Sequence, residues 1–475
     1  MTPKLLKSNF KNSVFNVCLI LFCWLSITAG TVCLGDQSVS ILSIVPYPSI
    51  GKTEGYIMIS RDIKLSAQVT YYFSICDLDL KSLKTREEKK APTETLESIA
   101  ISKTAIATAF QAMNGTLTVN SYDMQWNPLG NLVYKRVNKW EGPAQLTVNG
   151  ESGFILNRVT TEKIQLCNFI GLDQKLNKLW EVKSSLGFED HVWPLTYSTK
   201  TDRYFYNSYT VNIKTKHAGV LISNSSDGKE VMRYDFDREG IRLVGSPALH
   251  GAGKGDVIMA VFDYVKKNKE RGLLFVKMDV STKKATEKFV PLSSTELTGL
   301  VANATHKQWL SESEKSVHPY ELVKKGNNWV MVGQFYKGKP AELYAESLMF
   351  ATQGGTLAVL EFDADLNIKK ASTLENTTFS APTEVVLNNK GTKFTSTICG
   401  AGLINEVLKI KYLNYKDDTH CDYIVVSYDK DGKESITKKN IDLGTSNTMV
   451  NVLEGKNGKY NVLRYTFDHF EVTSE

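Results

Sequence analysis

The chain repeats one pattern of apolar and polar positions along most of its length. An apolar, largely alternating run leads into a turn at aspartate, and a second run rich in lysine follows. Clear copies occupy residues 70–89, 163–183, 357–373 and 422–443, and looser copies occupy 117–136, 218–236 and 272–292. Period-two alternation rich in Val, Ile, Tyr and Phe, broken by a short Asp, Asn or Gly turn, is typical of a β-hairpin. Each copy therefore predicts one hairpin.

The turn aspartates set the spacing of the repeat. They are Asp77, Asp123, Asp173, Asp227, Asp279, Asp363, Asp429 and Asp468. The first five lie about 50 residues apart, and the wider gap after Asp279 leaves room for one more hairpin at Gln334–Leu343, around Lys337-Gly338. A unit of roughly 50 residues with four strands matches a β-propeller blade. The prediction is an all-β propeller of roughly six to eight blades, seven or eight fitting the length best. A β-sandwich array and a two-domain all-β protein are the alternatives.

Strand-like runs at both ends of the chain bear on closure of such a ring. In a closed propeller, Ser38–Val45 and Tyr460–Val472 are expected to share one blade. Helical patterns are short, the best being Thr95–Ala107 and Glu342–Met349, and the first also fits a pair of strands. No low-complexity linker interrupts residues 36–475, so a single propeller-like domain is predicted there.

The N-terminus has the pattern of an export signal. Lys4, Lys7 and Lys11 precede an uncharged run at 12–35 that becomes rich in small residues near Gly30. A basic start, an apolar centre and small residues predict a signal peptide over residues 1–30. The same run is long enough to stay as an uncleaved membrane anchor. We therefore expect a secreted protein, or one of the periplasm or cell envelope, which contacts a membrane only if this segment is retained.

Charge and cysteine content exclude several classes. Three of the formal +6 charges lie in the leader and the rest are dispersed, so no nucleic-acid partner is expected. Seven cysteines without a CxxC motif exclude a disulfide scaffold and a zinc knuckle. Cys399 and Cys421 share one repeat, where they either pair or, as we favour, are two small buried apolar residues. The scattered histidines form no HxH or HExxH motif, so neither a metal site nor a cofactor is predicted.

The aspartate turns themselves resemble cation loops only superficially. In Asp429-Lys430-Asp431-Gly432, Lys438 would occupy the glutamate position of an EF-hand, so we interpret this segment as a hairpin turn. The same interpretation holds for the turns that begin at Asp363 and Asp77.

Two segments are candidates for ligand binding. ALHGAGKGD, residues 248–256, is expected to be a loop between two strands. Its glycines remove side-chain bulk, so His250, Lys254 and Asp256 could reach a ligand. It is no phosphate loop, because that motif requires a helix after GxxxxGK[ST].

The second candidate is FEDHVWP, residues 188–194. Asp190, His191 and Trp193 bring a carboxylate, an imidazole and an indole together, which suits carbohydrate binding or acid–base chemistry. We expect both segments to be exposed and at least one to line the mouth of the central channel. The alternative is that both are plain connections on the outer rim.

The segments YIVVSYDKDGKESITKK (423–439) and LAVLEFDADLNIKKAST (357–373) resemble repeats in uncharacterised exported propeller-like proteins of the Bacteroidetes type. The resemblance covers most of the chain after the leader, implies a propeller and export, and transfers no catalytic residue. The sequence thus favours an exported propeller that binds or scaffolds, with a protein or glycan ligand and no identifiable catalytic motif. A propeller-fold polysaccharide hydrolase or lyase and a membrane-anchored structural subunit are the alternatives.

Overall fold

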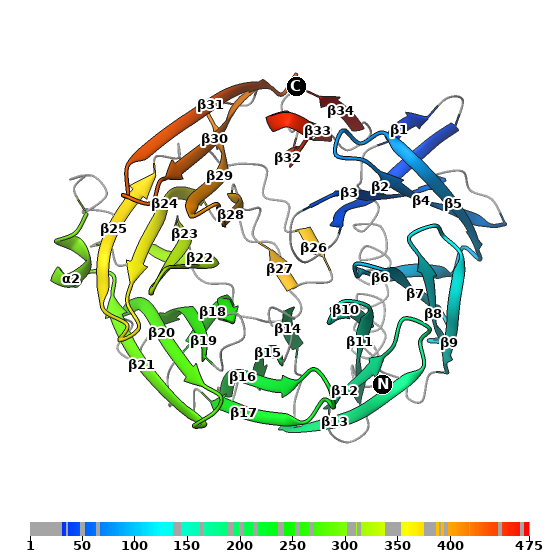
Figure 1. Ribbon diagram of the computed structural model, residues 1–475, viewed down its shortest axis with the longest axis horizontal. Coiled ribbons are helices and arrows are strands. Elements are labelled where there is room, and N and C mark those ends of the chain that lie inside the picture. The colour runs from blue at the N-terminus through cyan, green and yellow to red at the C-terminus, as the bar shows by residue number, and fades with distance from the viewer. Residues whose placement is uncertain are drawn as a thin grey trace, which may run out of the picture. The chain divides into compact units, whose positions relative to one another are not determined.

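The computed structural model describes residues 31–34, 37–47, 53–62, 67–135, 144–161, 165–188, 193–198, 204–211, 217–235, 242–251, 257–265, 270–301, 310, 315–337, 353–374, 386–388, 391–393, 398–417, 419–444, 449–465 and 470–474. These residues are nearly all in β-strands (Figure 1). Helix in this part of the chain is limited to α2 (Thr295–Thr298), the 3-10 turn η1 (Lys456–Gly458) and Leu310. None of it has the length and hydropathy needed to cross a bilayer. The expected signal segment lies outside the described residues.

The described strands form eight antiparallel sheets of three to five strands, numbered here in chain order. Sheet 1 is β1 (Thr31–Leu34), β2 (Gln37–Tyr47), β3 (Gly55–Asp62), β4 (Val69–Cys76) and β5 (Ser82–Lys90). Sheet 2 is β6 (Glu94–Ile101), β7 (Ala105–Ala112), β8 (Leu117–Asp123) and β9 (Pro128–Tyr134). Sheet 3 is β10 (Gln145–Asn149), β11 (Gly153–Thr161), β12 (Gln165–Leu172) and β13 (Lys178–Phe188). Sheet 4 is β14 (Trp193–Ser198), β15 (Tyr204–Val211), β16 (His217–Asn224) and β17 (Glu230–Asp235).

The second half of the chain continues the series. Sheet 5 is β18 (Arg242–Gly251), β19 (Val257–Val265), β20 (Arg271–Asp279) and β21 (Lys284–Pro291). Sheet 6 is β22 (Lys315–Lys325), β23 (Asn328–Lys337), β24 (Gln353–Phe362) and β25 (Ile368–Leu374), followed by the hairpin β26 (Val386–Asn388) and β27 (Gly391–Lys393). Sheet 7 is β28 (Ile398–Ile404), β29 (Val407–Tyr415), β30 (His420–Tyr428) and β31 (Glu434–Asp442). Sheet 8 is β32 (Met449–Glu454), β33 (Tyr460–Tyr465) and β34 (Phe470–Ser474).

Each sheet is a meander in which strands adjacent in sequence are hydrogen-bonded neighbours. Successive four-stranded meanders are the blades of a propeller, and they confirm the predicted all-β propeller class. In a four-stranded meander, the first–second and third–fourth connections lie at one end, named here the turn end. The second–third connection and the link to the next sheet lie at the other end, named the connector end. These two ends organise the rest of the description.

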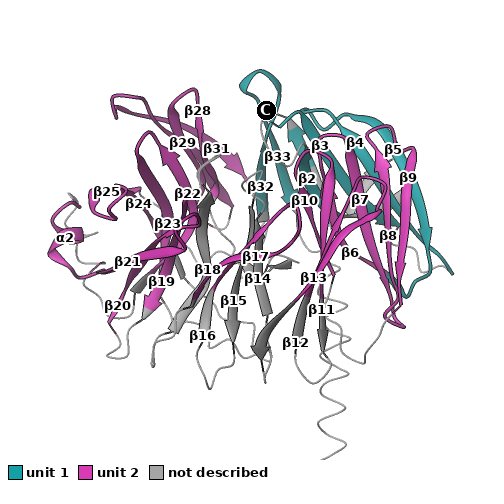
Figure 2. Ribbon diagram, turned by 60° about the horizontal axis from the view of Figure 1, so that its bottom comes forward, with its two compact units in different colours: residues 1–94, 447–475 teal, residues 95–446 magenta. Residues whose placement is uncertain are grey.

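The chain divides into two compact units (Figure 2). Unit 1 comprises residues 1–94 and 447–475 and so holds sheets 1 and 8, and unit 2 comprises residues 95–446 and holds sheets 2 to 7. The two ends of the described chain therefore belong to the same unit, and β1 lies next to β34. They do not share one sheet as predicted, because β2 belongs to sheet 1 and β33 to sheet 8.

The core of unit 2 lies between neighbouring sheets. Middle strands are apolar on both faces because each face packs against a different sheet: in β19, residues 258–262 are all buried. The lysine-rich second run of each repeat is the last strand of its sheet. There it is largely exposed, as in β31. Charged residues on such edges discourage pairing with other chains.

Of the two alternatives for Thr95–Ala107, the structure shows the pair of strands and not the helix, since the segment forms most of β6 and the start of β7. The turn between them is closed by Ser102, whose Oγ accepts the Ala105 N–H at 2.9 Å. Burial of Ala105 and its neighbours between sheets overrides the helix preference of alanine. The second helical candidate, Glu342–Met349, lies outside the described residues.

The gap between Asp279 and Asp363 holds one further hairpin, β22 and β23, as predicted. Its tight turn is at Gly326-Asn327, not at Lys337-Gly338. Residues 334–337 belong to β23.

Candidate functional site

The aspartate turns join the last two strands of their sheets. The five most alike begin at Asp77, Asp123, Asp173, Asp363 and Asp429. In each of them the first aspartate's Oδ1 accepts the backbone N–H groups two and four residues further on. For Asp363 both distances are 2.9 Å. The carboxylates thus serve their own turns, which confirms the interpretation of these segments as hairpin turns. Among the described residues, no group of three or more His, Cys, Asp or Glu side chains is arranged to hold a metal ion.

The fourth residue of these turns has a left-handed backbone. Its φ is 58° at Leu80, 62° at Trp126, 64° at Leu176 and 64° at Leu366. This conformation costs a residue with a Cβ roughly 1–2 kcal/mol. Burial offsets the cost, because Leu176 packs into the core between sheets 2 and 3 and Leu366 into the core between sheets 5 and 6. Each of these two turns therefore inserts an apolar side chain against the preceding sheet.

Polar contacts fasten the same turns to the preceding sheet. Lys277 of sheet 5 donates to the carbonyl of Ala364 at 3.2 Å, and Lys288 donates to Asn367 Oδ1 at 3.2 Å. Asn149 of sheet 3 donates to the carbonyl of Ser225 in the turn of sheet 4 at 3.0 Å. The aspartate turns of unit 2 are thus joints between sheets.

Unit 1 fastens its turn with an ion pair. Lys456, in the connection between β32 and β33, places Nζ 2.5 Å from Asp77 Oδ2, and its N–H donates to Asp79 Oδ1 at 3.0 Å. Asn461 donates to the carbonyl of Leu78. The Lys456 ammonium, together with backbone N–H groups, holds the pKa of Asp77 below its ordinary value. This set of contacts is named the Lys456 clasp.

One joint depends on glycine. The indole of Trp180 in β13 lies over Gly171 of its own sheet and over Gly228 in the turn of sheet 4. A Cβ at either glycine would overlap the indole, and Gly228 also has a φ of 71°. Larger residues therefore do not fit at these two positions without moving Trp180.

The structure places the first nominated segment differently from the prediction. Ala248 to Gly251 belong to β18, where His250 is paired with Met259, so only residues 252–256 are left to connect β18 with β19. Lys254 and Asp256 fall within that connection, outside the described residues. The strand ends that it joins lie at the turn end of sheet 5.

The second nominated segment links two sheets. Trp193 is the first residue of β14 and is paired with Thr210, whereas Asp190 and His191 lie outside the described residues. The strand ends that it joins lie at connector ends. The two segments therefore start from opposite ends of their sheets and do not make one site. Their exposure and their relation to a channel mouth stay predictions.

The connector end of sheet 6 carries the longest connections of the body. Residues 292–314 enter β22 there, residues 338–352 join β23 to β24 there, and residues 375–397 leave β25 there. Recognition residues concentrate on loops that a rigid scaffold positions. This end of sheet 6 is therefore the strongest candidate for a binding region.

Two polar side chains are buried at this end. His318 on β22 and Gln334 on β23 face each other in the strand pair and are 7% and 4% exposed. Burial lowers the pKa of His318 to about 4, so its imidazole is neutral near pH 7 and offers one donor and one acceptor. The ring of Tyr320 packs edge-on against it, with centroids 4.7 Å apart. Sequence reasoning missed His318 because its burial depends on packing between sheets. Its only local signal is a histidine between Val317 and Pro319.

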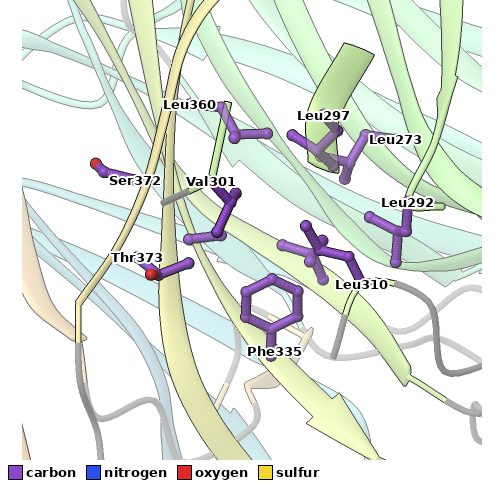
Figure 3. A pocket seen from close by; sticks show the side chains of 11 residues that line it. Leu273, Leu292, Leu297, Val301, Leu310, Phe335, Leu360, Ser372 and Thr373 are labelled. Atoms are coloured by element: carbon purple, nitrogen blue, oxygen red, sulfur yellow. The ribbon is translucent and has the colours of Figure 1, made fainter. Parts of the chain in front are cut away.

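A small cavity lies beside this region, between sheets 5 and 6 (Figure 3). Leu297 in α2 and Val301 just after it line the cavity together with Leu310, Phe335 and Thr373. Its volume of about 10 Å³ is close to the minimum for one water molecule. We interpret it as a packing gap and not as a ligand pocket.

An exposed polar cluster closes the connection between β29 and β30. His420 Nδ1 lies 3.0 Å from Asp417 Oδ1 and 2.9 Å from Thr419 Oγ1. Hydrogen bonds from Thr419, and then from His420, lower the pKa of Asp417 to about 2. Leu443 donates to the carbonyl of Thr419 at 2.8 Å. Since the side-chain bonds of Asp417, Thr419 and His420 are made to one another, the cluster acts as a turn cap.

No disulfide joins Cys421, which is buried, to Cys399, which is half-buried. Burial raises the pKa of Cys76 to about 11 and that of Cys399 to about 12. Thiols held protonated in this way are poor nucleophiles.

Comparisons with known proteins add little to this description. No protein-family model matches the chain, and no curated protein matches it. An apocarotenoid oxygenase from Synechocystis is 12% identical with a TM-score of 0.35 over 54% of this chain and 63% of its own. A structure from a study of prolyl endopeptidases is 11% identical with a TM-score of 0.42 over 93% and 55%. A europium-containing methanol dehydrogenase is 11% identical with a TM-score of 0.40 over 90% and 84%. The chain spans less than two thirds of the first two, and similarity this low transfers no site.

Proposed function

We propose that this chain is an exported propeller-like protein that binds or scaffolds, and that a protein or glycan ligand contacts the connector end of sheet 6. The observation that carries the proposal is the convergence of the three longest connections at that one end. At the same end of sheet 6, the neutral His318 and Gln334 are buried opposite each other on adjacent strands. Export rests on the leader pattern of residues 1–30.

A loop replacement tests the binding region. Residues 338–352 are replaced by a short Gly/Ser linker, and the mature protein is screened on a glycan array and against candidate cell-surface proteins. The matched control replaces residues 199–203, which join β14 and β15 at the turn end of sheet 4. We expect both variants to keep the wild-type circular dichroism and urea midpoint, and only the first to lose binding. Equal binding by both variants would contradict the proposed region.

Mass spectrometry of the secreted product tests export. We expect a mature chain that begins between residues 30 and 36. An intact Met1 on a cytosolic product would overturn export without bearing on the binding region.

A further inference from the structure

Every sheet ends in an edge strand, and one of these edges differs from the others. An edge strand leaves a row of backbone N–H and C=O groups unpaired, and charged side chains commonly stop other chains from pairing with it. The last strands of the other seven sheets carry at least one charged residue each. Among the last strands that the structure describes, β9 alone has none: its sequence is PLGNLVY.

The side chains of β9 keep this edge ordered. Leu129, Leu132 and Tyr134 pack against the core between sheets 2 and 3, and the guanidinium of Arg158 lies 4.7 Å from the centre of the Tyr134 ring. Asn131 donates to Asn120 Oδ1 at 2.7 Å across the strand pair. On the exposed side, Val133 keeps 51% of its surface in solvent. The strand thus presents a well-anchored, uncharged edge.

We propose that β9 is an interaction edge, through which two copies of this chain associate by antiparallel β9–β9 pairing about a two-fold axis. A second copy is the partner that the charge pattern favours, because β9 brings no like charges together when it meets itself. Pairing of β5, β21 or β25 with its own copy would instead bring lysines together.

The position of Lys135, just after β9, favours one register of the pair. If Asn131 faces Asn131 of the other copy, Val133 faces Leu129, and Lys135 falls beside Asn127. The two lysines then lie at opposite ends of the pair. Favourable cross-strand pairs contribute roughly 0.2–1 kcal/mol each. The association is therefore expected to be weak and to depend on concentration.

Sedimentation velocity of the mature full-length protein over a range of concentrations tests the proposal. We expect a monomer–dimer equilibrium that Val133→Lys shifts to monomer, with an unchanged thermal midpoint because the site is exposed. Leu179→Lys is the matched control, since Leu179 is 60% exposed on β13, an edge strand that already carries charges. This control should leave the dimer intact.

Three results would overturn the proposal. They are a monomer at every concentration, a dimer that survives Val133→Lys, and an equal loss of dimer in both variants. Capture of a different protein at β9 by a chain that stays monomeric would also refute pairing with a second copy. None of these results bears on ligand binding at sheet 6.

Discussion

The junction between sheets 5 and 6 and the junction between sheets 1 and 8 hold the same kind of turn by different means. In unit 2, Leu366 of the sheet 6 turn enters a large apolar core that includes Phe275, Phe335 and Phe362. In unit 1, the described core beside the turn is Met58, Cys76 and Leu463, with Leu80 only partly buried.

In the junction between sheets 1 and 8, polar contacts supply part of the anchoring that apolar burial supplies between sheets 5 and 6. The Lys456 clasp bonds to the sheet 1 turn at Asp77, Leu78 and Asp79. The comparison shows that the turn geometry is repeated along the chain while the chemistry that anchors it varies. Full burial of a leucine contributes about 1.5–3 kcal/mol, whereas an exposed ion pair contributes about 0–1 kcal/mol. Solution conditions should therefore affect the stability of the junction between sheets 1 and 8 more than that of the junction between sheets 5 and 6.

The largest effect is expected at the apolar junction. Phe275 is fully buried, and its ring packs edge-on against Phe362 with centroids 4.8 Å apart. Phe275→Ala should lower the free energy of unfolding by about 3–5 kcal/mol, through lost burial and the cavity that remains. Urea unfolding measures the change. Leu463→Ala in the other junction is the comparison and should cost about 2 kcal/mol. A larger loss at Leu463 would reverse the comparison.

The left-handed turn residue gives a diagnostic order of effects. Leu366→Ala should cost about 2–3 kcal/mol from lost burial. Leu366→Gly should cost roughly 1 kcal/mol less than the alanine variant, because glycine adopts the positive φ of 64° without strain. At an ordinary buried position, glycine is the worse of the two. Chemical denaturation of the two variants measures the difference. A more stable alanine variant would contradict the strain argument.

A smaller effect is expected at the Lys456 clasp. The Lys456 side chain is 46% exposed, so solvent screens its pair with Asp77. Lys456→Met should lower the stability only slightly at low salt, and 1 M NaCl should shrink the difference from wild type. Thermal unfolding at two salt concentrations measures both. A salt-independent difference would show that the alkyl chain, and not the charge, matters.

The smallest effect is the pH dependence of Asp363. The Lys369 ammonium, followed by backbone N–H groups, lowers the pKa of Asp363 to about 2, against about 3.9 in an unfolded chain. The unfolded state therefore takes up the proton first, and the stabilisation present above about pH 4 is lost as pH falls toward 2. The difference between Asp363→Asn and wild type should thus be smaller at pH 2.5 than at pH 7. Urea titrations at both pH values test this, and a constant difference would contradict it.

Much of the fold follows from local sequence. Hairpins and aspartate turns are encoded within a few residues, so the all-β class and the turn interpretation of Asp363 and Asp429 could be predicted. For Thr95–Ala107 the local sequence fits both a helix and a pair of strands, because burial between sheets, which is not local, decides the conformation. The extent of the first nominated loop was wrong because His250 pairs with Met259 across to β19, and the glycines start only beyond it.

The joints between sheets were harder to foresee. Leucine carries no signal for a left-handed backbone, so Leu176 and Leu366 were not recognised as anchors. A usable signal exists, since an asparagine follows the first aspartate by four residues in three of the turns, at Asn127, Asn177 and Asn367. In the candidate binding region, the burial of His318 arises from packing between sheets, which no short window of sequence contains.

The placement of Trp180 has a consequence for how such a chain grows by gene duplication. Trp180 belongs to sheet 3, but one of the two glycines beneath its indole, Gly228, belongs to sheet 4. A duplicated segment cut at the borders of sheet 4 would contain Gly228 but not Trp180, whose indole packs over that glycine. A segment that starts within β12 and ends after the turn at Gly228 would keep indole and glycines together. A unit duplicated with this contact intact would therefore not coincide with a single sheet.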